Sequence, residues 1–329
     1  DIKSFSELLD FIRSETDSHL GKLDLPEEPA YLYDPIRYAL AGKGKRLRPI
    51  LVHLSGRGFD ADPDDLMYAG LAVELLHNFT LIHDDIMDHD DTRHGKQTVH
   101  KKFGTEAAIL TGDSIFTLAQ LIIGQVQSNT VQALQAFNKA SLTVCEGQAY
   151  DLQFEGDSTV TLDKYLDMIS RKTGALLSLC AELGGILGAK SDDVCAELRS
   201  YGLNLGRGFQ VQDDILEIFS DKENLGKSLE SDVAADKQTI LTILARKHDG
   251  WNEISRSDAD ISTKRERMRS FYIETGVEVR AREISRGYID KAKDSLTIFE
   301  GDHKITMDQF TDFVLNSKEI HQQHIRNHK

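Results

Sequence analysis

Residues 64–88 read DDLMYAGLAVELLHNFTLIHDDIMD, and this stretch decides the fold. Its apolar residues recur at helical spacing and form one broad stripe, which predicts a single long helix. The stretch ends in HDDIMD, where Asp84 and Asp88 stand four positions apart. Residues at that spacing share a helix face, with Cβ atoms about 5–6 Å apart. We therefore expect a pair of carboxylates at the carboxyl-terminal end of this helix.

A second acidic cluster repeats the pattern. Residues 212–217 read QDDILE, so Asp213 and Glu217 are again four positions apart, with Asp214 beside them. Neighbouring carboxylates repel one another and lose solvation when partly buried, so a compensating group is expected. A hard cation such as Mg²⁺ binds through a few carboxylates together with substrate phosphate oxygens. One such cluster is as readily a solvated helix face, whereas two clusters of equal spacing favour a metal site.

Long helices are expected in most of the remaining chain. All five prolines lie before residue 64, so none interrupts a later helix. The apolar spacing predicts helices over 105–127, 130–155, 161–187, 192–219, 238–248, 263–275, 278–297 and 306–320. Four threonines stand where N-caps are expected, namely Thr105, Thr130, Thr161 and Thr306. No sustained period-two alternation predicts a sheet. The pattern favours one all-α domain over residues 1–329.

The composition excludes several classes of partner. The chain has 329 residues, of which 40% are hydrophobic and 28% charged, as in ordinary soluble globular proteins. A net charge of −15 argues against nucleic acid and against an anionic membrane surface as the partner. No uninterrupted apolar stretch reaches 18 residues, so no integral membrane segment is expected. The three cysteines lie in apolar helical patterns, which predicts reduced, buried thiols and a cytoplasmic location.

Cations that would contact phosphate groups occur in several segments. Residues 42–49 read GKGKRLRP and supply Lys43, Lys45, Arg46 and Arg48. The order of a Walker loop is absent from this segment. Further candidates are Arg93, the RKTG segment at 171–174, Lys227 and Lys237. Gly174 lies inside a helical pattern and predicts a kink whose freed carbonyls face a ligand, although a tolerated glycine would give the same pattern.

These groups together imply a metal-assisted reaction of a diphosphate ester. Two carboxylate pairs facing each other across a helical bundle would hold two or three Mg²⁺ ions around one diphosphate and stabilise the departing pyrophosphate. The sequence offers no convincing nucleophile with an adjacent base. Chemistry driven by ionisation of a leaving group needs none.

Several motifs occur in the order typical of one family. They are GKGKRLRP, ELLHNFTLIHDDIMDHDDTRHGK, GQAYD, RKTG, GFQVQDDILE and GKSLESDVAADKQT, between about residues 30 and 245. The chain thereby resembles the trans-isoprenyl diphosphate synthases of the polyprenyl synthetase family, above all the archaeal geranylgeranyl diphosphate synthases. Residues 246–329 resemble the family only as generic helices. The resemblance implies the isoprenoid synthase fold, a helical bundle around a deep central cavity, usually in a homodimer.

The resemblance also implies a cofactor, substrates and site residues. The cofactor is Mg²⁺, two or three ions per site with Mn²⁺ as a substitute, and the substrates are small prenyl diphosphates. The implied metal ligands are Asp84, Asp88, Asp213, Asp214 and Glu217. Isopentenyl diphosphate would be contacted by Lys45, Arg48, His77 and His94. The allylic diphosphate or its carbocation would be contacted by Arg93, Gln148, Lys172, Thr173, Gln210, Lys227 and Lys237, with Asp151 lining the same cavity. The implied catalytic set is Asp84, Asp85, Asp88, Lys172, Thr173, Gln210 and Asp213.

Three residues depart from the family pattern, and one region bears on product length. His94 replaces an arginine, Glu217 an aspartate and Gln238 a lysine. Phe79, with Thr80 beside it, lies five residues before Asp84, about 7.5 Å along a helix. In similar family members a bulky residue there helps to form the cavity floor, which favours a C20 product. A C15 or mixed C15/C20 product is the alternative, and ordinary core packing is the alternative role for Phe79.

The implied mechanism is ionisation, condensation and elimination. The Thr173 hydroxyl, Gln210 and carbonyls at the kink would stabilise the allylic carbocation, and the released pyrophosphate would take the proton. Three other functions remain open from the sequence. A class I terpene cyclase would lack the site built from Lys45, Arg48 and His77, and a non-catalytic subunit of a heteromeric synthase would have lost its acidic motifs. A phosphohydrolase would rest on His83 and Asp84.

Overall fold

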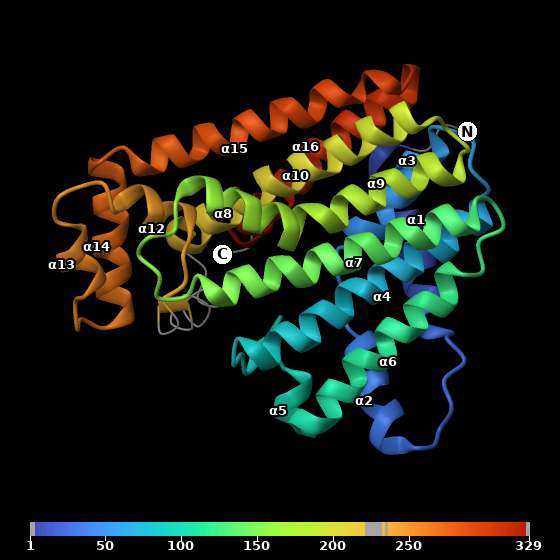
Figure 1. Cartoon of the computed structure of the whole chain (residues 1–329), viewed down its shortest axis with the longest axis horizontal. Helices are drawn as coiled ribbons and strands as arrows, with labels where there is room; N and C mark the ends of the chain where they lie inside the picture. The colour runs from blue at the N-terminus through green and yellow to red at the C-terminus, as the bar shows by residue number, and fades with distance from the viewer. Residues whose placement is uncertain (1–3, 221–231, 234–235, 327–329) are drawn as a thin grey trace. The chain divides into compact units, whose positions relative to one another are not determined.

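The fold consists almost entirely of helices, which confirms the all-α prediction (Figure 1). It comes from a computed structural model that describes residues 4–220, 232–233 and 236–326, with side chains up to residue 316. Residue contacts divide the chain into two compact units. Unit 1 comprises Asp1–Leu142, Leu176–Gly202 and Ser295–Phe310, and unit 2 comprises Thr143–Ala175, Leu203–Asp294 and Thr311–Lys329. The single domain expected from the sequence stays a prediction.

The helices follow one another with short connections. The first six are α1 (Phe5–Gly21), α2 (Ala30–Leu40), α3 (Leu47–Arg57), α4 (Pro63–Met87), α5 (Val99–Phe103) and α6 (Thr105–Ile123). Next come α7 (Thr130–Gln153), α8 (Leu162–Ile169), a π-helical turn at Ser170–Gly174, α9 (Ala175–Leu187) and α10 (Asp192–Phe219). The last are α12 (Ile240–Ala245), α13 (Trp251–Ser255), α14 (Ile261–Glu274), α15 (Val277–Asp294), a 3₁₀ turn at Ser295–Ile298 and α16 (Gly301–Arg326). The strands β1 (Thr92–Arg93) and β2 (Lys96–Gln97) form a small antiparallel hairpin.

Helix α4 confirms the central prediction from the sequence. Asp62 caps its first turn by accepting a hydrogen bond from the Asp64 amide at 2.8 Å, and Pro63 occupies the first helical position. The predicted apolar stripe is buried against α3 and α6 in unit 1. The helix ends at Met87, and the Asp88 amide donates to the Asp84 carbonyl at 2.7 Å. The first acidic motif therefore occupies the partly exposed end of a well-buried helix.

Helix α6 is long and apolar enough to cross a membrane, judged by length and composition alone. In unit 1 it packs against α4, beside which it lies in Figure 1. Ala108, Ile115, Ala119 and Ile123 on this helix are completely buried. Much of its apolar surface thus belongs to the core of unit 1. Among the described residues, α6 is the one helix that meets this test.

Some local predictions were wrong. Thr161 is the N-cap of α8 as expected, but Thr105 and Thr130 are the first residues of their helices. Thr306 lies inside α16, where its hydroxyl donates to the Asp302 carbonyl at 2.9 Å instead of capping a helix. Cys145 is exposed, although its apolar surroundings in the sequence predicted a buried thiol.

The core of unit 2 joins short helices from the carboxyl-terminal part of the chain to α8 and α10. Trp251 on α13 is the only tryptophan in the sequence and is 6% exposed. Its ring stacks on Tyr272 of α14, with ring centroids 5.5 Å apart. Val211 and Ile215 of α10 belong to the same buried cluster. Packing in this cluster therefore holds α10 in place where it carries the second acidic motif.

Candidate active site

The first acidic motif is joined to the following hairpin by an ion pair in which the carboxylate is buried and the arginine is partly exposed. Asp85 is 4% exposed and accepts two hydrogen bonds from Arg93 of β1, at 2.9 Å from Nε and 2.7 Å from Nη2. Burial lowers the pKa of the Arg93 guanidinium, but the hydrogen bonds to Asp85 and its charge outweigh burial and raise this pKa. Such a two-pronged pair fixes orientation as well as charge. Asp85 therefore holds Arg93 beside the neighbouring Asp84.

Several of the predicted diphosphate contacts lie together in unit 1. The pKa of His77 on α4 is lowered well below its ordinary value, first by burial and then by the positive charges of Arg48, Arg93 and His94. His77 is therefore neutral and lies within electrostatic reach of these three groups. A neutral imidazole among cations offers hydrogen bonding without further repulsion. The structure thus gathers four of the predicted substrate contacts around the middle of α4.

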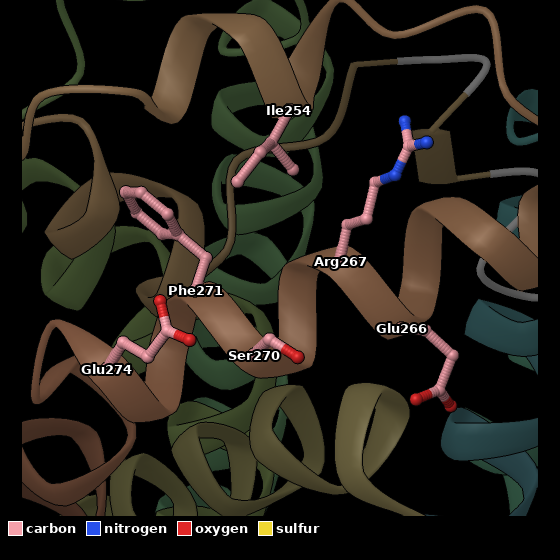
Figure 2. A pocket seen from close by; sticks show the side chains of 6 residues that line it. All are labelled: Ile254, Glu266, Arg267, Ser270, Phe271 and Glu274. Atoms are coloured by element: carbon pink, nitrogen blue, oxygen red, sulfur yellow. The ribbon is translucent and has the colours of Figure 1, made fainter.

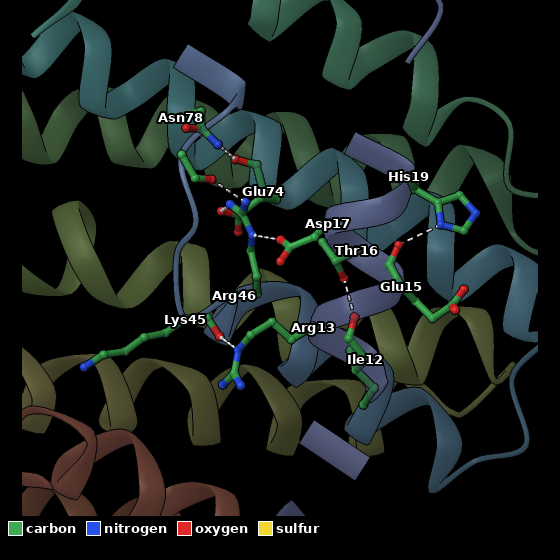
Figure 3. A network of polar contacts seen from close by, with 11 residues as sticks. Ile12, Arg13, Glu15, Thr16, Asp17, His19, Lys45, Arg46, Glu74 and Asn78 are labelled. Carbon is green, nitrogen blue, oxygen red and sulfur yellow. Dashed lines mark hydrogen bonds and ion pairs between the residues drawn. The ribbon is translucent and has the colours of Figure 1, made fainter. Parts of the chain in front are cut away.

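Arg46 has a different role from the one that the sequence indicated. We predicted that it adds positive charge for a phosphate, but its guanidinium is directed into unit 1 (Figure 3). Nε donates to Asp17 at 2.7 Å, Nη1 to Glu74 at 2.8 Å and Nη2 to the Gly42 carbonyl at 2.7 Å. Its backbone is left-handed, with φ of 54°. Arg46 thus links the loop between α2 and α3 to α1 and α4.

Phe79 lies in an aromatic cluster one turn before the first acidic motif. Its ring contacts Phe116 of α6 and His83, with centroid distances of 5.1 and 5.0 Å. Phe116 in turn stacks on Phe137 of α7 at 6.3 Å. The Thr80 hydroxyl donates to the His77 carbonyl at 2.7 Å. This packing is compatible with both roles considered for Phe79, the cavity floor and the core.

The second acidic motif lies on α10, and Asp214 is its most constrained member. Its carboxylate accepts hydrogen bonds from the Tyr165 hydroxyl, from Gln210 Nε2 at 3.2 Å and from the Ile240 amide at 3.1 Å. Burial raises the pKa of Asp214 to about 6, despite these hydrogen bonds. Both oxygens are engaged, which points to a positioning role. Its role as a metal ligand stays a prediction, and nothing in the spacing of the residues indicated Tyr165 as its partner.

Glu217 and Asp232 are two further carboxyl groups beside Asp214, and burial disfavours the charged form of both. The pKa of Glu217 is raised to about 8, first by burial and then by the charges of Asp232, Asp214 and Asp213. Burial is also the largest cause that raises the pKa of Asp232 to about 7. Glu217 Oε1 is buried and has no hydrogen-bond partner among the described residues. A bound cation would relieve both the repulsion and the missing contact.

This donor set fits Mg²⁺ without forming a complete cage. In the described part of the chain, no group of three or more histidine, cysteine, aspartate or glutamate side chains is arranged to hold a metal. Mg²⁺ keeps several water molecules and is usually bound by one or two carboxylates plus substrate phosphates, so a complete protein cage is not required. The buried, partnerless oxygen of Glu217 is the structural sign that such an ion fits here.

Asp151 of α7 holds two of the predicted substrate-binding lysines. Lys172 Nζ lies 2.5 Å from Asp151 Oδ2, and Lys237 Nζ lies 3.1 Å from the same oxygen. Lys237 also pairs with Glu155 at 2.8 Å. Burial raises the pKa of Asp151, but the charges of Lys172 and Lys237 outweigh it and lower this pKa. The arrangement keeps two ammonium groups together at one carboxylate, which the sequence spacing did not reveal.

Thr173 lies in the π-helical turn, which confirms the predicted departure from a regular helix near Gly174. The Thr173 hydroxyl donates to Gln210 Oε1 at 2.9 Å, so the two predicted carbocation contacts touch each other. Gln148 on α7 is 6% exposed, and neither polar atom of its side chain has a partner among the described residues. An unsatisfied buried amide is costly unless a ligand or water completes it. Lys227 lies outside the described residues.

Two hollows occur in unit 2. One has a volume of about 80 Å³ and is lined by Asp214, Glu217, Asp232, Trp251 and Tyr272, among others. It has room for water molecules behind the second motif. The other is an open pocket on α13 and α14, lined by Ile254, Glu266, Arg267, Ser270, Phe271 and Glu274 (Figure 2). None of the predicted site residues lies in that open pocket, so the reaction is not assigned to it.

The sequence profile described as Polyprenyl synthetase matches residues 29–271. The chain belongs to the polyprenyl synthetase family. It is therefore a transferase of prenyl groups, as the motifs predicted. The match continues beyond residue 245, where the recognisable motifs end, and includes α13 and most of α14.

Relatives and solved structures agree with this assignment. The chain is 34% identical to a geranylgeranyl diphosphate synthase of Methanosarcina mazei, over 92% of this chain and 95% of that protein. It is 33% identical to a geranylfarnesyl diphosphate synthase of Natronomonas pharaonis, over 88% of this chain and 91% of that one. Two relatives with different product names thus support the assignment to this family.

The same fold occurs in crystal structures of the family. A geranylgeranyl pyrophosphate synthase aligns with a TM-score of 0.87 and 32% identity, covering 96% of this chain and 99% of that one. A polyprenyl synthase from Caulobacter crescentus, complexed with calcium and isoprenyl diphosphate, aligns with a TM-score of 0.84 and 28% identity, covering 96% and 98%. These similarities confirm the predicted fold over nearly the whole chain.

Proposed function

We propose that this polyprenyl synthetase condenses isopentenyl diphosphate with dimethylallyl, geranyl or farnesyl diphosphate and releases geranylgeranyl diphosphate, the C20 product. The observation that carries the proposal is the extent of the family match, because residues 29–271 include every predicted site residue from Lys45 to Lys237. The name of the Methanosarcina relative supports the C20 product. A C15 or mixed C15/C20 product is the alternative from the sequence. The name of another relative, a geranylfarnesyl diphosphate synthase, adds a product longer than C20 to the alternatives.

Isopentenyl diphosphate is assigned to the cationic cluster of unit 1. Arg48 and His77, with Lys45 and His94, would bind its phosphates. Support comes from the proximity of Arg48 and His94 to His77. It also comes from Arg46, whose hydrogen bond to Glu74 anchors the loop that carries Lys45. His94, which replaces the family's usual arginine, would donate a hydrogen bond to a phosphate oxygen.

The divalent cation is assigned to the acidic motifs. The proposed ligands of two or three Mg²⁺ ions, with Mn²⁺ as a substitute, are Asp84 and Asp88 in the first motif and Asp213, Glu217 and the more constrained Asp214 in the second. The bound ion would act as a Lewis acid that neutralises the charge developing on pyrophosphate. The unsatisfied Glu217 oxygen supports this assignment, as does the calcium in the related Caulobacter structure.

The remaining residues bind and orient the allylic substrate. Lys172 and Lys237 would pass from Asp151 to the diphosphate oxygens, because a doubly charged diphosphate attracts ammonium groups more strongly than one carboxylate does. The Thr173 hydroxyl and the Gln210 carbonyl oxygen, oriented by their mutual hydrogen bond, would face the carbocation. The proton lost after condensation would go to the pyrophosphate, so no protein base is assigned.

Exposed apolar side chains on α6 and α7 support the proposed homodimer. Leu121 is 63% exposed on α6, and Val131 and Leu142 are 64% and 65% exposed on α7. Gln120 and Asn138 join the two helices beside them with a hydrogen bond of 3.0 Å. Leu121→Glu with Leu142→Glu should convert the dimer to monomers in sedimentation velocity, and an unchanged sedimentation coefficient would exclude this surface. The proposed location is the cytoplasm, as the sequence indicated.

The direct test is incubation of the enzyme with Mg²⁺, labelled isopentenyl diphosphate and each allylic primer in turn. Chromatography of the dephosphorylated products should show elongation that ends at the C20 alcohol, and omission of Mg²⁺ with added chelator should abolish it. Failure to elongate any primer would refute the synthase function. Asp84→Asn is the matched inactive control, because it removes one expected metal ligand at nearly constant volume.

A further inference from the structure

Two arginines of α14 bind the carboxyl-terminal end of α10. Arg265 Nε donates to the Ile218 carbonyl at 3.2 Å, and its Nη2 donates to the Ser220 carbonyl. Arg269 Nε donates to the Ile218 carbonyl at 2.5 Å, and its Nη2 donates to the Ser220 carbonyl at 2.8 Å. Each of the two carbonyls therefore accepts hydrogen bonds from both guanidinium groups. The two arginines lie four positions apart and thus share one face of α14.

These hydrogen bonds satisfy carbonyl groups at the end of the helix that carries the second acidic motif. The last carbonyls of a helix have no intrahelical donor, and they carry the negative end of the helix dipole. Ile218 and Ser220 are 4% and 3% exposed, so water has little access to satisfy their carbonyls. The guanidinium groups of the two arginines supply the missing hydrogen-bond donors and a positive charge opposite the helix dipole. Without them the last turn of α10 would fray, and Glu217 lies in that turn.

We propose that Arg265 and Arg269 are positioning residues that clamp the last turn of α10 and thereby hold Glu217 where the second motif binds the metal-bound diphosphate. The inference rests on the proposed function. It assigns a role at the site to α14, which lies beyond the last recognisable motif. Neither arginine touches substrate in this proposal. Both contact the backbone of α10, and the positive charge of Arg265 also acts on Glu217.

The test compares two variants that remove positive charge from the same helix, two charges in the clamp variant and one in the control. Arg265→Gln with Arg269→Gln removes the clamp. Arg267→Gln is the control, because Arg267 is exposed, donates to Ser257 Oγ at 3.2 Å and lines the open pocket on α13 and α14 (Figure 2). Three readouts apply to each protein: hydrogen–deuterium exchange of the α10 amides, calorimetric binding of inorganic pyrophosphate with Mg²⁺, and binding of isopentenyl diphosphate alone.

We expect the clamp variant to exchange the amides of residues 213–219 about tenfold faster and to bind magnesium pyrophosphate about tenfold more weakly, since residues that orient ligands typically contribute 10- to 100-fold. Binding of isopentenyl diphosphate should stay within about twofold of wild type, because its proposed site lies in unit 1. Arg267→Gln should match wild type in all three readouts. A paired Arg265→Lys and Arg269→Lys variant keeps the charge but loses the fork, and should fall between the two.

Two outcomes would overturn the clamp. One is wild-type exchange and pyrophosphate affinity in the double glutamine variant. The other is an equal loss of both ligands in the glutamine and the lysine variants, which would show general unfolding instead of local positioning. Failure of the proposed function is distinguishable, because the wild-type enzyme would then elongate no primer while the exchange result at α10 still stood.

Discussion

Replacing Arg46 with methionine should destabilise unit 1 by about 3–5 kcal/mol, the usual cost of leaving one partner of a buried ion pair without its counter-charge. The side chains of Arg46 and Glu74 are each 6% exposed, so Glu74 would keep a charge that water cannot reach. Asp17 is 33% exposed and would be rehydrated, so it adds little to the loss. Glu74→Gln should cost less, about 1–2 kcal/mol, because the amide oxygen still accepts a hydrogen bond from Arg46.

The measurement is urea unfolding followed by far-ultraviolet circular dichroism, with the double variant Arg46→Met and Glu74→Leu as the decisive control. Replacing both members of a buried pair by apolar side chains is often neutral, so the double variant should recover most of the loss. A single variant that costs less than about 1 kcal/mol, or a double variant no more stable than Arg46→Met, would refute the reasoning. Isopentenyl diphosphate should also bind more weakly to Arg46→Met, because the Lys45 loop loses its tether to α4.

Three further predictions follow from other features. Phe79→Ala should lengthen the main product by one five-carbon unit on chromatography, and an unchanged product distribution would exclude Phe79 from the cavity floor. Burial, together with the charges of Arg57 and His19, lowers the pKa of His53 to about 4. In the unfolded chain this histidine has its ordinary pKa of about 6.5 and therefore binds a proton at a higher pH than in the folded chain. The free energy of unfolding should therefore fall by about 2 kcal/mol from about pH 7.5 to about pH 5. His53→Gln should remove that part of the urea-measured pH dependence, and an unchanged slope would contradict it. Gly147→Ala should abolish elongation, because its Cβ would lie 2.3 Å from the backbone nitrogen of Lys172 in the π turn, whereas Gly287→Ala meets no neighbour within 4 Å and should retain full activity.

The sequence predicted the features that depend on local spacing. The stripe of α4, the long α10 and the departure from a regular helix near Gly174 all follow from periodicity and from residue types within one or two turns. Several helix ends were placed wrongly for the same reason. Thr306 carries an N-cap signal, but α16 starts five residues earlier, and threonine inside a helix bonds back to the preceding turn just as well.

Partners that meet through the fold could not be predicted. Lys237 reaches Asp151 across 86 positions, and Arg269 reaches Ser220 across 49. Spacing along the chain carries no information on such pairs, because chain folding alone brings them together. Arg46 shows the converse case, since a basic side chain in a basic loop is indistinguishable in sequence from a phosphate ligand until its acidic neighbours are placed.

The solitary tryptophan gives this enzyme an optical signal that comes from unit 2 alone. Trp251 stacks on Tyr272 and lines the same small hollow as Glu217. Its emission therefore follows the packing of that unit, while circular dichroism averages over every helix of the chain. Coincident denaturation curves from the two signals would mean that both units unfold in one cooperative transition. Separated curves would assign each unit its own stability, with no label introduced.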